Sequence, residues 1–400
     1  MLRGIKNKER TKEVESKKAL LITTVSGFVP QFEMNNVHIL QELGYEVHYA
    51  SNFHHPHYGF DNQRLKGSGI CCHQVGFVRS PFRIRKNIQA YQELKAILFQ
   101  QQFDLIHCHT PMGGVLGRLA AKSWRRKEPK GKLKVYYTAH GFHFFRGAPL
   151  FHWLFYYPVE WWLARETDVL LTLNQEDYQR AKRFRLRKVD GKRGKVERIF
   201  GVGIDWKNYE NLTKDREKIR KQLKIASDCK VFLSVGELTK RKNHRVVIEA
   251  IALLKKEGKA EKVRYFICGE GPERKKLMDL IQRKRLTKIV QLLGYQTEVK
   301  NWLAIADCFV FPSKQEGLPV ALLEAKATGL PCICSNIRGC RELVEKEELV
   351  SRNRKEEYLK KIKEQIEQVA IEKEKMEKEE KRRDYSKEQV MSQMRRIYRT

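Results

Sequence analysis

Residues 308–327 run from a strand through a glycine-containing turn into a helix. Residues 308–311 are a short apolar run of the kind that forms a buried strand. Gly317 and Pro319 interrupt the pattern, and good helix formers resume it over residues 320–327. A strand that leads through a short turn into a helix is the repeating unit of α/β proteins with parallel sheets. The segment therefore predicts a buried strand, a turn and the start of a helix.

Two glutamates frame this turn. Glu316 precedes the predicted helix, and Glu324 lies about one turn inside it. Backbone N–H groups at a helix start lack intrahelical partners and carry the positive end of the helix dipole, so they suit a diphosphate. Carboxylates at two depths can accept hydrogen bonds from two groups of hydroxyls, such as those of a ribose and of a sugar. The pattern favours a sugar-nucleotide site, and acids that compensate the dipole of an ordinary helix are the alternative.

The N-terminal half shows the same alternation of strands and helices. An apolar run at residues 19–25, a helical pattern at 35–43 and a second apolar run at 46–50 give the order strand, helix, strand. Two further predicted strands, at 103–110 and 135–143, carry histidines toward their carboxyl ends. Ligands of open α/β sheets bind at this edge of the sheet. We therefore expect a doubly wound sheet with histidines beside its ligand site.

Four segments of the second half resemble, in this order, the donor domain of retaining glycosyltransferase family 4. They are residues 231–250, 265–272, 290–295 and 316–324, the last with seven residues between its two glutamates. The resemblance implies the GT-B fold, in which two Rossmann-like doubly wound domains face a central cleft. Residues 140–149 and 201–205 resemble more closely the branch that builds bacterial capsular, extracellular or glycan polysaccharides on a lipid carrier.

The resemblance also implies roles for individual residues. Lys242 aligns with a lysine that clamps the donor phosphate, and Glu324 would bind the ribose hydroxyls. Glu316 would bind the donor sugar, and His140 would contact the sugar as it is transferred. We predict that His140, Lys242 and Glu316 are catalytic. The predicted donor-binding residues are Gly27, Gly236, Lys242, Gly294, Gly317, Leu318, Pro319 and Glu324.

One position departs from the family pattern. The family usually has arginine directly after the glycine of the first donor-domain loop, whereas this chain has Glu237 after Gly236. Lys240 or Arg241 could replace the missing cation, or Lys242 and backbone groups could hold the phosphate alone. The sequence leaves these alternatives open. We assign no covalent nucleophile, because the resemblance implies a reaction on one face of the sugar, assisted by the donor phosphate, without the carboxylate pair of a glycoside hydrolase.

We expect no metal and no other cofactor. The glutamate pair is not an Asp-X-Asp arrangement, and Lys242 supplies the countercharge. His54, His55 and His57, with His73, could bind a metal only if their loop folded suitably, since no carboxylate or cysteine accompanies them at a recognised spacing. The nine cysteines lack zinc-knuckle and redox spacing, so we expect buried thiols in a reducing cytosol.

The net charge of +32, from 80 basic against 48 acidic residues, favours an anionic partner. No nucleic-acid-binding motif accompanies this charge, so we do not expect nucleic acid. Residues 77–86 interleave Arg and Lys with Phe and Ile, a mixture that suits a headgroup layer. The sequence has no run of eighteen apolar residues, which is the length needed to span a bilayer. We therefore expect a cytoplasmic protein, peripheral on the cytoplasmic face of an anionic membrane.

Residues 142–162 are unusually rich in aromatic side chains. Such residues could contact a membrane surface or pack inside the protein. For Phe151, Leu154 and Phe155 we expect packing beneath the N-terminal sheet.

The expected organisation has four parts. Residues 1–18 form a charged extension without the cleavage pattern of a signal peptide. Residues 19–203 form an acceptor-side domain and residues 204–384 a nucleotide-sugar donor domain, and residues 385–400 form a helix that returns to the first domain. Within the donor domain, Lys and Glu dominate residues 345–384, which predicts a solvated helical segment where the family usually has a loop and strand.

The expected function is transfer, with retention, of a hexose or N-acetylhexosamine from a nucleotide sugar to a saccharide or lipid-linked acceptor in surface polysaccharide synthesis. UDP is the expected nucleotide by resemblance alone. Two alternatives are a nucleotide-sugar epimerase of the GT-B fold and a basic membrane- or nucleic-acid-binding module without transfer activity. Sugar release without acceptor would favour an epimerase or a hydrolase. Binding to an anionic polymer that is unaffected by Glu316→Ala and by Lys242→Ala would favour the binding module.

Overall fold

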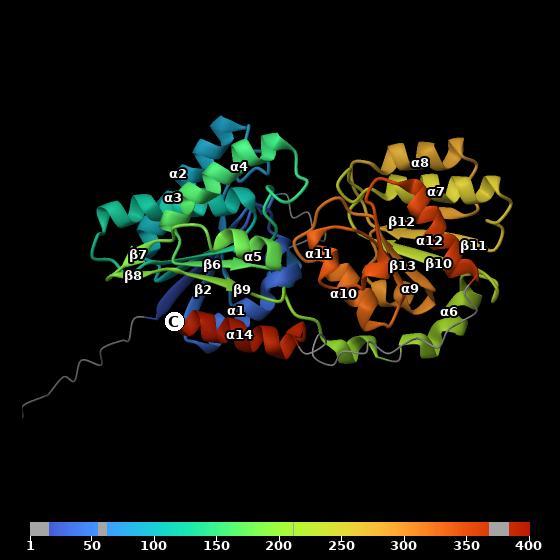
Figure 1. Cartoon of the computed structure of the whole chain (residues 1–400). Helices are drawn as coiled ribbons and strands as arrows, with labels where there is room; N and C mark the ends of the chain where they lie inside the picture. The colour runs from blue at the N-terminus through green and yellow to red at the C-terminus, as the bar shows by residue number, and fades with distance from the viewer. Residues whose placement is uncertain (1–15, 55–61, 211, 368–383) are drawn as a thin grey trace, which may run out of the picture.

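The computed structural model describes residues 16–54, 62–210, 212–367 and 384–400. Two α/β domains lie side by side, each built on a parallel sheet with helices packed on it (Figure 1). This arrangement confirms the predicted fold class. The predicted charged extension lies almost wholly outside the described residues.

The first domain has a parallel sheet of seven strands in the order β3-β2-β1-β4-β5-β6-β9. Its strands are β1 (Lys17–Ile22), β2 (Tyr45–Ser51), β3 (Cys71–Gln74), β4 (Leu105–Cys108), β5 (Lys134–Ala139), β6 (Val169–Thr172) and β9 (Lys195–Arg198). The antiparallel pair β7 (Lys188–Val189) and β8 (Lys192–Arg193) precedes β9. The strand order reverses between β1 and β4, so a crevice opens there at the carboxyl ends.

The helices of this domain cover both faces of the sheet. They are α1 (Met34–Glu42), α2 (Ile84–Gln101), α3 (Pro111–Lys127), α4 (Leu150–Leu163) and α5 (Gln175–Ala181), with the single turns η1 (Val29–Glu33), η2 (Gln63–Leu65) and η3 (Ala164–Glu166). In α2, the buried residues Ala90, Leu94 and Leu98 recur every four positions, which directs one face of the helix onto the core.

The second domain has a parallel sheet of six strands in the order β12-β11-β10-β13-β14-β15. Its strands are β10 (Lys230–Val235), β11 (Val263–Cys268), β12 (Val290–Gly294), β13 (Cys308–Phe311), β14 (Cys332–Ser335) and β15 (Leu349–Val350). Its helices are α6 (Arg216–Gln222), α7 (His244–Lys256), α8 (Arg274–Arg283), α9 (Val299–Ile305), α10 (Val320–Ala327), α11 (Arg338–Arg341) and α12 (Lys355–Glu367), with turns η4 (Trp206–Tyr209), η5 (Leu212–Asp215) and η6 (Lys346–Glu348). Here the order reverses between β10 and β13.

Residues 345–367 follow the predicted solvated helical segment only in part, since α12 is a helix but the segment also contains a strand and buried side chains. The short strand β15 continues the sheet beside β14, and α12 buries Tyr358 and Ile362 against the core that it shares with α7. A two-residue strand leaves almost no periodic signal in a stretch dominated by charge, so sequence patterning could not find it. The rest of the predicted segment, residues 368–383, lies outside the described residues.

The last helix, α14 (Lys387–Arg399), packs against α1 of the first domain (Figure 1). The Tyr398 hydroxyl lies 2.7 Å from Nδ1 of His107, and the Tyr136 hydroxyl donates to the carbonyl of Ile397 at 3.0 Å. One continuous cluster of buried apolar side chains includes residues of both sheets and of α14. The chain therefore ends on the domain where it began.

The predicted packing of Phe151, Leu154 and Phe155 beneath the first sheet is wrong. Their side chains are 52%, 70% and 36% exposed on the surface of α4. A helix that is apolar on nearly every side can bury only the face that meets its neighbours, and α4 buries Glu160 and Leu163 there. The remaining apolar side chains therefore form a surface.

The prediction of buried thiols is confirmed for seven of the nine cysteines, all of which are free. Cys71 and Cys72 are exposed instead, because they lie on the short edge strand β3. Among the described helices, none combines the length and the apolar character needed to cross a membrane.

Candidate active site

One large cavity, of about 1770 Å³, is lined by both domains at the carboxyl ends of their sheets. This is where two doubly wound sheets that face each other place their ligands. Eight of the ten predicted site residues line it: His140, Gly236, Lys242, Glu316, Gly317, Leu318, Pro319 and Glu324. The two sheets thus bring residues that are up to 184 positions apart (from 140 to 324) to one site.

Glu316 and Lys242 form a charged pair on the wall of this cavity that the second domain supplies. The Nζ of Lys242 lies 2.9 Å from Oε1 of Glu316, and the Ser313 hydroxyl lies 2.6 Å from the same oxygen. Burial acts to raise the pKa of Glu316, but Lys242, Arg241 and Ser313 together hold that pKa below its usual value. Glu316 is therefore a carboxylate at neutral pH, and it holds the Lys242 ammonium in the cavity.

The arginine beside Lys242 also faces the site. The guanidinium of Arg241 lies 2.5 Å from Oε1 of Glu316 and donates to the carbonyl of Gln315 at 2.9 Å. Of the two cations proposed to replace the missing arginine, Arg241 lines the cavity, whereas Lys240 is exposed and is not among the lining residues. Arg241 therefore has the placement that the replacement requires.

Glu237, the residue that departs from the family pattern, faces the other domain. Its carboxylate lies 3.9 Å from the guanidinium of Arg79, and both residues line the cavity. This charge reversal creates a contact between the two domains at the rim of the site.

Glu324 lies inside helix α10, which follows residues 312–319, the turn that is predicted to hold the donor and is called the donor turn below. Its Oε1 accepts a hydrogen bond of 3.0 Å from the hydroxyl of Tyr209. Burial raises the pKa of Glu324, although Tyr209 and Lys300 act to lower it. Among the described residues no side chain caps the start of α10, so its first backbone N–H groups are open to a ligand from Gly317 onward.

The donor turn touches the first domain so closely that only glycine fits. A Cβ at Gly317 would lie 1.8 Å from the carbonyl oxygen of His140. Gly141 faces it with a φ of +137°, a backbone conformation that L side chains rarely adopt. The close approach of these two backbones fixes the distance between His140 and the donor turn.

Two predicted donor-binding glycines are not among the lining residues. Gly27 is buried beside Phe28, which lines the cavity in its place. Gly294 forms a turn at the end of β12, where its carbonyl accepts a 2.7 Å hydrogen bond from the N–H of Gly269. The residues after Gly294, from Tyr295 onward, line the cavity instead.

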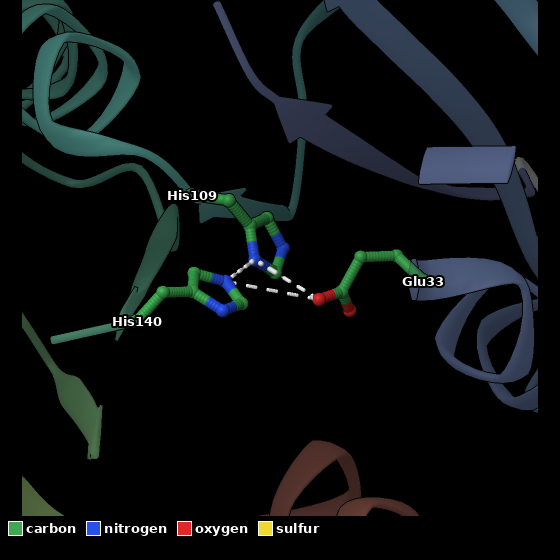
Figure 2. A group of neighbouring side chains, drawn as sticks. All are labelled: Glu33, His109 and His140. Carbon is green, nitrogen blue, oxygen red and sulfur yellow. Dashed lines mark hydrogen bonds and ion pairs between the residues drawn. The ribbon is translucent and has the colours of Figure 1, made fainter. Parts of the chain in front are cut away.

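His140, which is half-buried at the cavity wall, belongs to a polar cluster with the buried side chains of His109 and Glu33 (Figure 2). Nδ1 of His109 and Nε2 of His140 are 3.1 Å apart, so one of these nitrogens carries the proton between them. Oε1 of Glu33 lies 3.5 Å from the His109 nitrogen and 3.8 Å from the His140 nitrogen. The side chains come from the ends of β4 and β5 and from the turn η1 that leads into α1.

Burial sets the protonation of this cluster. It lowers the pKa of His140 to about 4 and the pKa of His109 well below its usual value, so both imidazoles are neutral at pH 7. It raises the pKa of Glu33 to about 8, although Asn36 donates to its carboxyl group. A neutral carboxylic acid and two neutral imidazoles can pass hydrogen bonds among themselves without burying a charge.

Two groups of side chains among the described residues have metal-ligand chemistry. Besides Glu33, His109 and His140, the side chains of Glu46, His48 and Cys71 also converge. His55 and His57 of the predicted loop lie outside the described residues, and His73 is hydrogen-bonded to His48 at 2.8 Å. The expectation that no metal is required stays a prediction.

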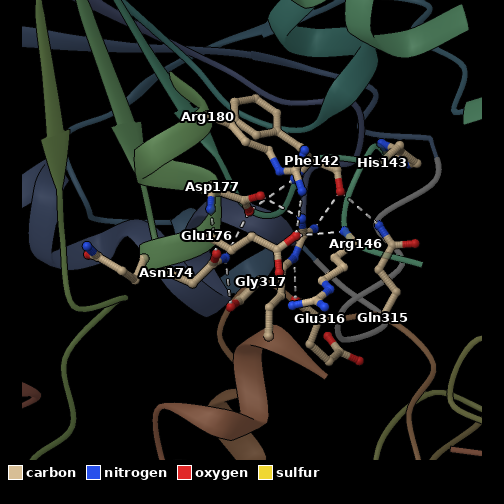
Figure 3. A network of polar contacts seen from close by, with 12 residues as sticks. Phe142, His143, Arg146, Asn174, Glu176, Asp177, Arg180, Gln315, Glu316 and Gly317 are labelled. Atoms are coloured by element: carbon tan, nitrogen blue, oxygen red, sulfur yellow. Dashed lines mark hydrogen bonds and ion pairs between the residues drawn. The ribbon is translucent and has the colours of Figure 1, made fainter. Parts of the chain in front are cut away.

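A polar network joins the two domains beside the donor turn (Figure 3). Arg338 of α11 forms a buried ion pair of 2.5 Å with Asp177 of α5. It also donates to the carbonyl oxygens of Phe142 and Glu316. Burial raises the pKa of Asp177 to about 6, although Arg338 acts to lower it. The guanidinium thus ties α5 to the segment that carries Glu316.

Two amide side chains extend this network. Oδ1 of Asn174 caps the N-terminus of α5 at the N–H of Asp177, and its Nδ2 donates to the carbonyl of Gly317 at 3.1 Å. Nε2 of Gln315 donates to the carbonyl of Phe142 at 3.3 Å. The donor turn is therefore held from the first domain as well as from its own.

Comparison with known proteins identifies the class. Family models for glycosyl transferases group 1 and for glycosyltransferase family 4 match residues 215–388 and 36–191. The putative glycosyltransferase EpsD of Bacillus subtilis is 34% identical over 330 residues, which are 82% of this chain and 81% of that protein. The UDP-Gal:alpha-D-GlcNAc-diphosphoundecaprenol alpha-1,3-galactosyltransferase of Escherichia coli is 30% identical over 263 residues, 66% of this chain and 65% of that protein.

Solved structures agree on the fold. Anabaena HepE in complex with UDP and glucose matches with a TM-score of 0.72 at 17% identity, covering 96% of this chain and 99% of that one. Sucrose-phosphate synthase from Thermosynechococcus elongatus matches with a TM-score of 0.71 at 18% identity, covering 96% and 98%. The two-domain fold is therefore GT-B. The chain belongs to the glycosyltransferases of group 1 and family 4 and is a glycosyltransferase.

Sequence analysis expected the histidines at the end of β4, His109 among them, beside the ligand site, but it predicted no role for His109. It missed Glu33 and Tyr209, because they lie in single helical turns, which leave no periodic signal and whose positions depend on the packing around them.

Proposed function

We propose that this glycosyltransferase moves a hexose or N-acetylhexosamine from a UDP-sugar to a lipid-linked saccharide, with retention, in the synthesis of a surface polysaccharide. The observation that carries the proposal is the placement of Lys242 and Arg241, opposite His140 across a cavity that both domains line. A transferase needs this arrangement, because donor and acceptor must meet between cations for the phosphate and groups for the sugar.

The leaving group is the part of the reaction that the donor side supports best. When the sugar leaves, negative charge develops on the nucleotide phosphate, and fixed cations and backbone N–H groups lower the barrier. Lys242, Arg241 and the open start of α10 supply both kinds of donor. Before donor binds, the carboxylate of Glu316 compensates the two cations, and the arriving phosphate competes for them.

Glu324 and Tyr209 are placed to bind the ribose. A carboxylate accepts hydrogen bonds from a pair of vicinal hydroxyls, and the Tyr209 hydroxyl orients it. UDP as the nucleotide is supported by HepE, whose complexes contain UDP with glucose and UDP-glucose. The same likeness supports a hexose as the transferred sugar.

His140 would contact the transferring sugar as a neutral imidazole. Its hydrogen bond with His109 orients the ring, and burial keeps charge away from the positive sugar that forms in the transition state. No covalent nucleophile is assigned, so the donor phosphate is the proposed base for the acceptor hydroxyl.

The acceptor and the pathway are supported by relatives. The Escherichia coli galactosyltransferase acts on a diphosphoundecaprenol-linked sugar, and a putative colanic acid biosynthesis glycosyltransferase, WcaL, is 30% identical over 296 residues. A nucleotide-sugar epimerase would need no acceptor, and the cavity's extension into the first domain favours a transferase. A polymer-binding module would not require the buried Glu316 and Lys242 pair.

A peripheral membrane position is part of the proposal. Exposed apolar side chains of α4, among them Phe151 and Leu154, lie near exposed cations at the start of α2, such as Arg83 and Arg85. The ring of Phe82, two residues before α2 begins, lies 5.8 Å from the ring of Phe155 in α4. Apolar side chains flanked by cations suit an anionic headgroup layer.

The thermal midpoint with UDP, GDP, ADP and dTDP in turn tests the donor site. A ligand that binds only the native state raises the midpoint. We expect a rise with UDP that is lost in Lys242→Ala and Glu324→Ala and retained in Lys240→Ala. The rise should be equal with and without EDTA, because no metal is expected to hold the phosphates. No rise with any nucleotide would contradict the proposed donor site.

A further inference from the structure

The reaction cavity continues into an apolar groove of the first domain. Residues of α2, α3 and α4, which lie on the same side of the first sheet, line the cavity together with His140 and Lys242 (Figure 1). The groove residues used below are Ile84 and Ile88 of α2, Met112, Leu116 and Leu119 of α3, and Phe155 of α4. A nucleotide and a saccharide are polar and bind mainly through hydrogen bonds and ion pairs, so they do not account for apolar walls that extend over three helices.

The groove leads from the surface to the interior. Ile84, Ile88 and Phe155 are 67%, 52% and 36% exposed, whereas Met112 and Leu116 are 8% and 5% exposed. Contiguous apolar surface that remains open to water marks a binding site more often than chance packing. Since the inner walls belong to the reaction cavity, whatever fills the groove also reaches the reaction centre.

Cations lie beside the apolar walls. Arg83, Arg85 and Lys86 are exposed around the start of α2. Arg64 and Arg79 line the cavity itself, where Arg64 is bound to Gln31. Apolar walls beside several cations are complementary to a long hydrocarbon that carries a diphosphate.

We propose that this groove binds the isoprenoid chain of a polyprenyl diphosphate that carries the acceptor saccharide. The inference rests on the proposed function. Only if the acceptor saccharide lies at His140 does the attached isoprenoid chain extend into the groove. Contact with a membrane surface alone would use exposed residues such as Leu154 and would leave the walls at Met112 and Leu116 unused. A second copy of the protein would cover the surface without entering the reaction cavity.

The test compares the binding of geranylgeranyl diphosphate with that of isopentenyl diphosphate by titration calorimetry, without membranes or donor. The two probes share the head group and differ in chain length. Burial of additional hydrocarbon strengthens binding with every methylene. We expect the longer probe to bind at least about thirtyfold more tightly.

Two matched variants locate the effect. Leu119→Trp fills the groove and should remove most of the length preference. Leu154→Trp adds the same ring to α4 outside the cavity and should retain it. Ile88→Glu, on a half-exposed side chain, is the second groove variant if Leu119→Trp fails to fold, and it should also weaken binding of the longer probe by about tenfold or more.

Equal affinity for the two diphosphates would overturn the proposed role of the groove. A preference for the longer diphosphate that is unchanged in both groove variants would overturn it as well. Binding to phosphatidylglycerol vesicles without any length preference would replace the groove with surface contact. The nucleotide experiment separates the two proposals. If UDP raises the thermal midpoint but the two diphosphates bind equally, the groove proposal fails and the donor-site proposal stands. If UDP has no effect but the longer diphosphate binds more tightly, the donor-site proposal fails and the groove proposal stands.

Discussion

At the residue scale, Lys242 and Glu316 are the residues that we propose to contact the donor phosphate and the donor sugar. We expect Lys242→Ala and Glu316→Ala each to lower transfer by at least about a hundredfold, because each removes a contact to charge or sugar in the transition state. Initial rates of transfer with purified variants measure this. Lys240→Ala is the matched control, since this exposed lysine does not line the cavity and should retain activity. Full activity in either site variant would refute the assignment.

The raised pKa of Glu33 makes stability depend on pH. Burial moves this pKa to about 8, so between about 4.5 and 8 the native state holds a proton that the unfolded chain has lost. The free energy of unfolding therefore falls as pH rises through this interval. In Glu33→Gln this fall should shrink by on the order of 5 kcal/mol, because the interval spans about 3.5 pH units at about 1.4 kcal/mol each. Denaturant unfolding at a series of pH values measures it.

The titratable groups that face Glu33 are His109, His140 and the hydroxyl of Tyr398. The histidine pKa values are lowered, so those two residues weaken the fold only as pH falls below about 6.5, in the opposite direction. Both proteins contain them, and they cancel to first order in the comparison. Parallel curves for wild type and Glu33→Gln would show that Glu33 is already ionised in the native protein.

At the scale of elements, the network that joins α5, α11 and the donor turn has one central group, the guanidinium of Arg338. We expect Arg338→Ala to lower the free energy of unfolding by about 3–5 kcal/mol, because it leaves Asp177 buried without its partner. Denaturant unfolding measures the loss. Arg341→Ala, in the same short helix but exposed, is the control and should change stability by less than about 1 kcal/mol. If Arg338→Ala and Arg341→Ala lower the free energy of unfolding equally, the network around Arg338 contributes little to stability.

Helix α4 shows how a composition can be read from the sequence while its environment cannot. Residues 142–162 are rich in aromatic side chains, but such side chains suit the core of a protein and a membrane-facing surface alike. Which use applies depends on how much of the helix its neighbours cover. For Phe151 and Leu154 that information is absent from the local sequence.

At the scale of the whole molecule, the distance between the domains is set where Gly317 meets His140. We expect Gly317→Ala to force the domains apart, since the added Cβ would lie 1.8 Å from a carbonyl oxygen. Transfer should fall by about tenfold or more, because small displacements of reacting groups cost large factors in rate. Small-angle scattering should show a larger radius of gyration.

Gly76→Ala serves as the control for Gly317→Ala. A Cβ at Gly76 meets Glu93 at 3.5 Å, an ordinary contact, so both shape and activity should stay unchanged. If Gly317→Ala is fully active with an unchanged radius of gyration, the turn has room to move and does not set the spacing of the domains.

The sequence by itself determined the fold class, the family and most of the residues that the second domain places on the wall of the cavity. Strand, turn and helix succeed one another within about twenty residues, and the paired glutamates and Lys242 lie in such local segments. Local order of this kind is sufficient because parallel α/β topology places the carboxyl ends of the strands at one edge. The roles expected for these residues follow from the same segments.

Only the tertiary structure decided what comes together from separate elements. It placed Glu33 and His109 against His140, set Arg338 against Asp177 and Glu237 against Arg79, and left the apolar side of α4 open beside the groove. Each of these contacts joins residues at least 31 positions apart. No periodic pattern encodes such contacts, because they depend on how two sheets and their helices pack, and the free energy of that packing is shared among many residues.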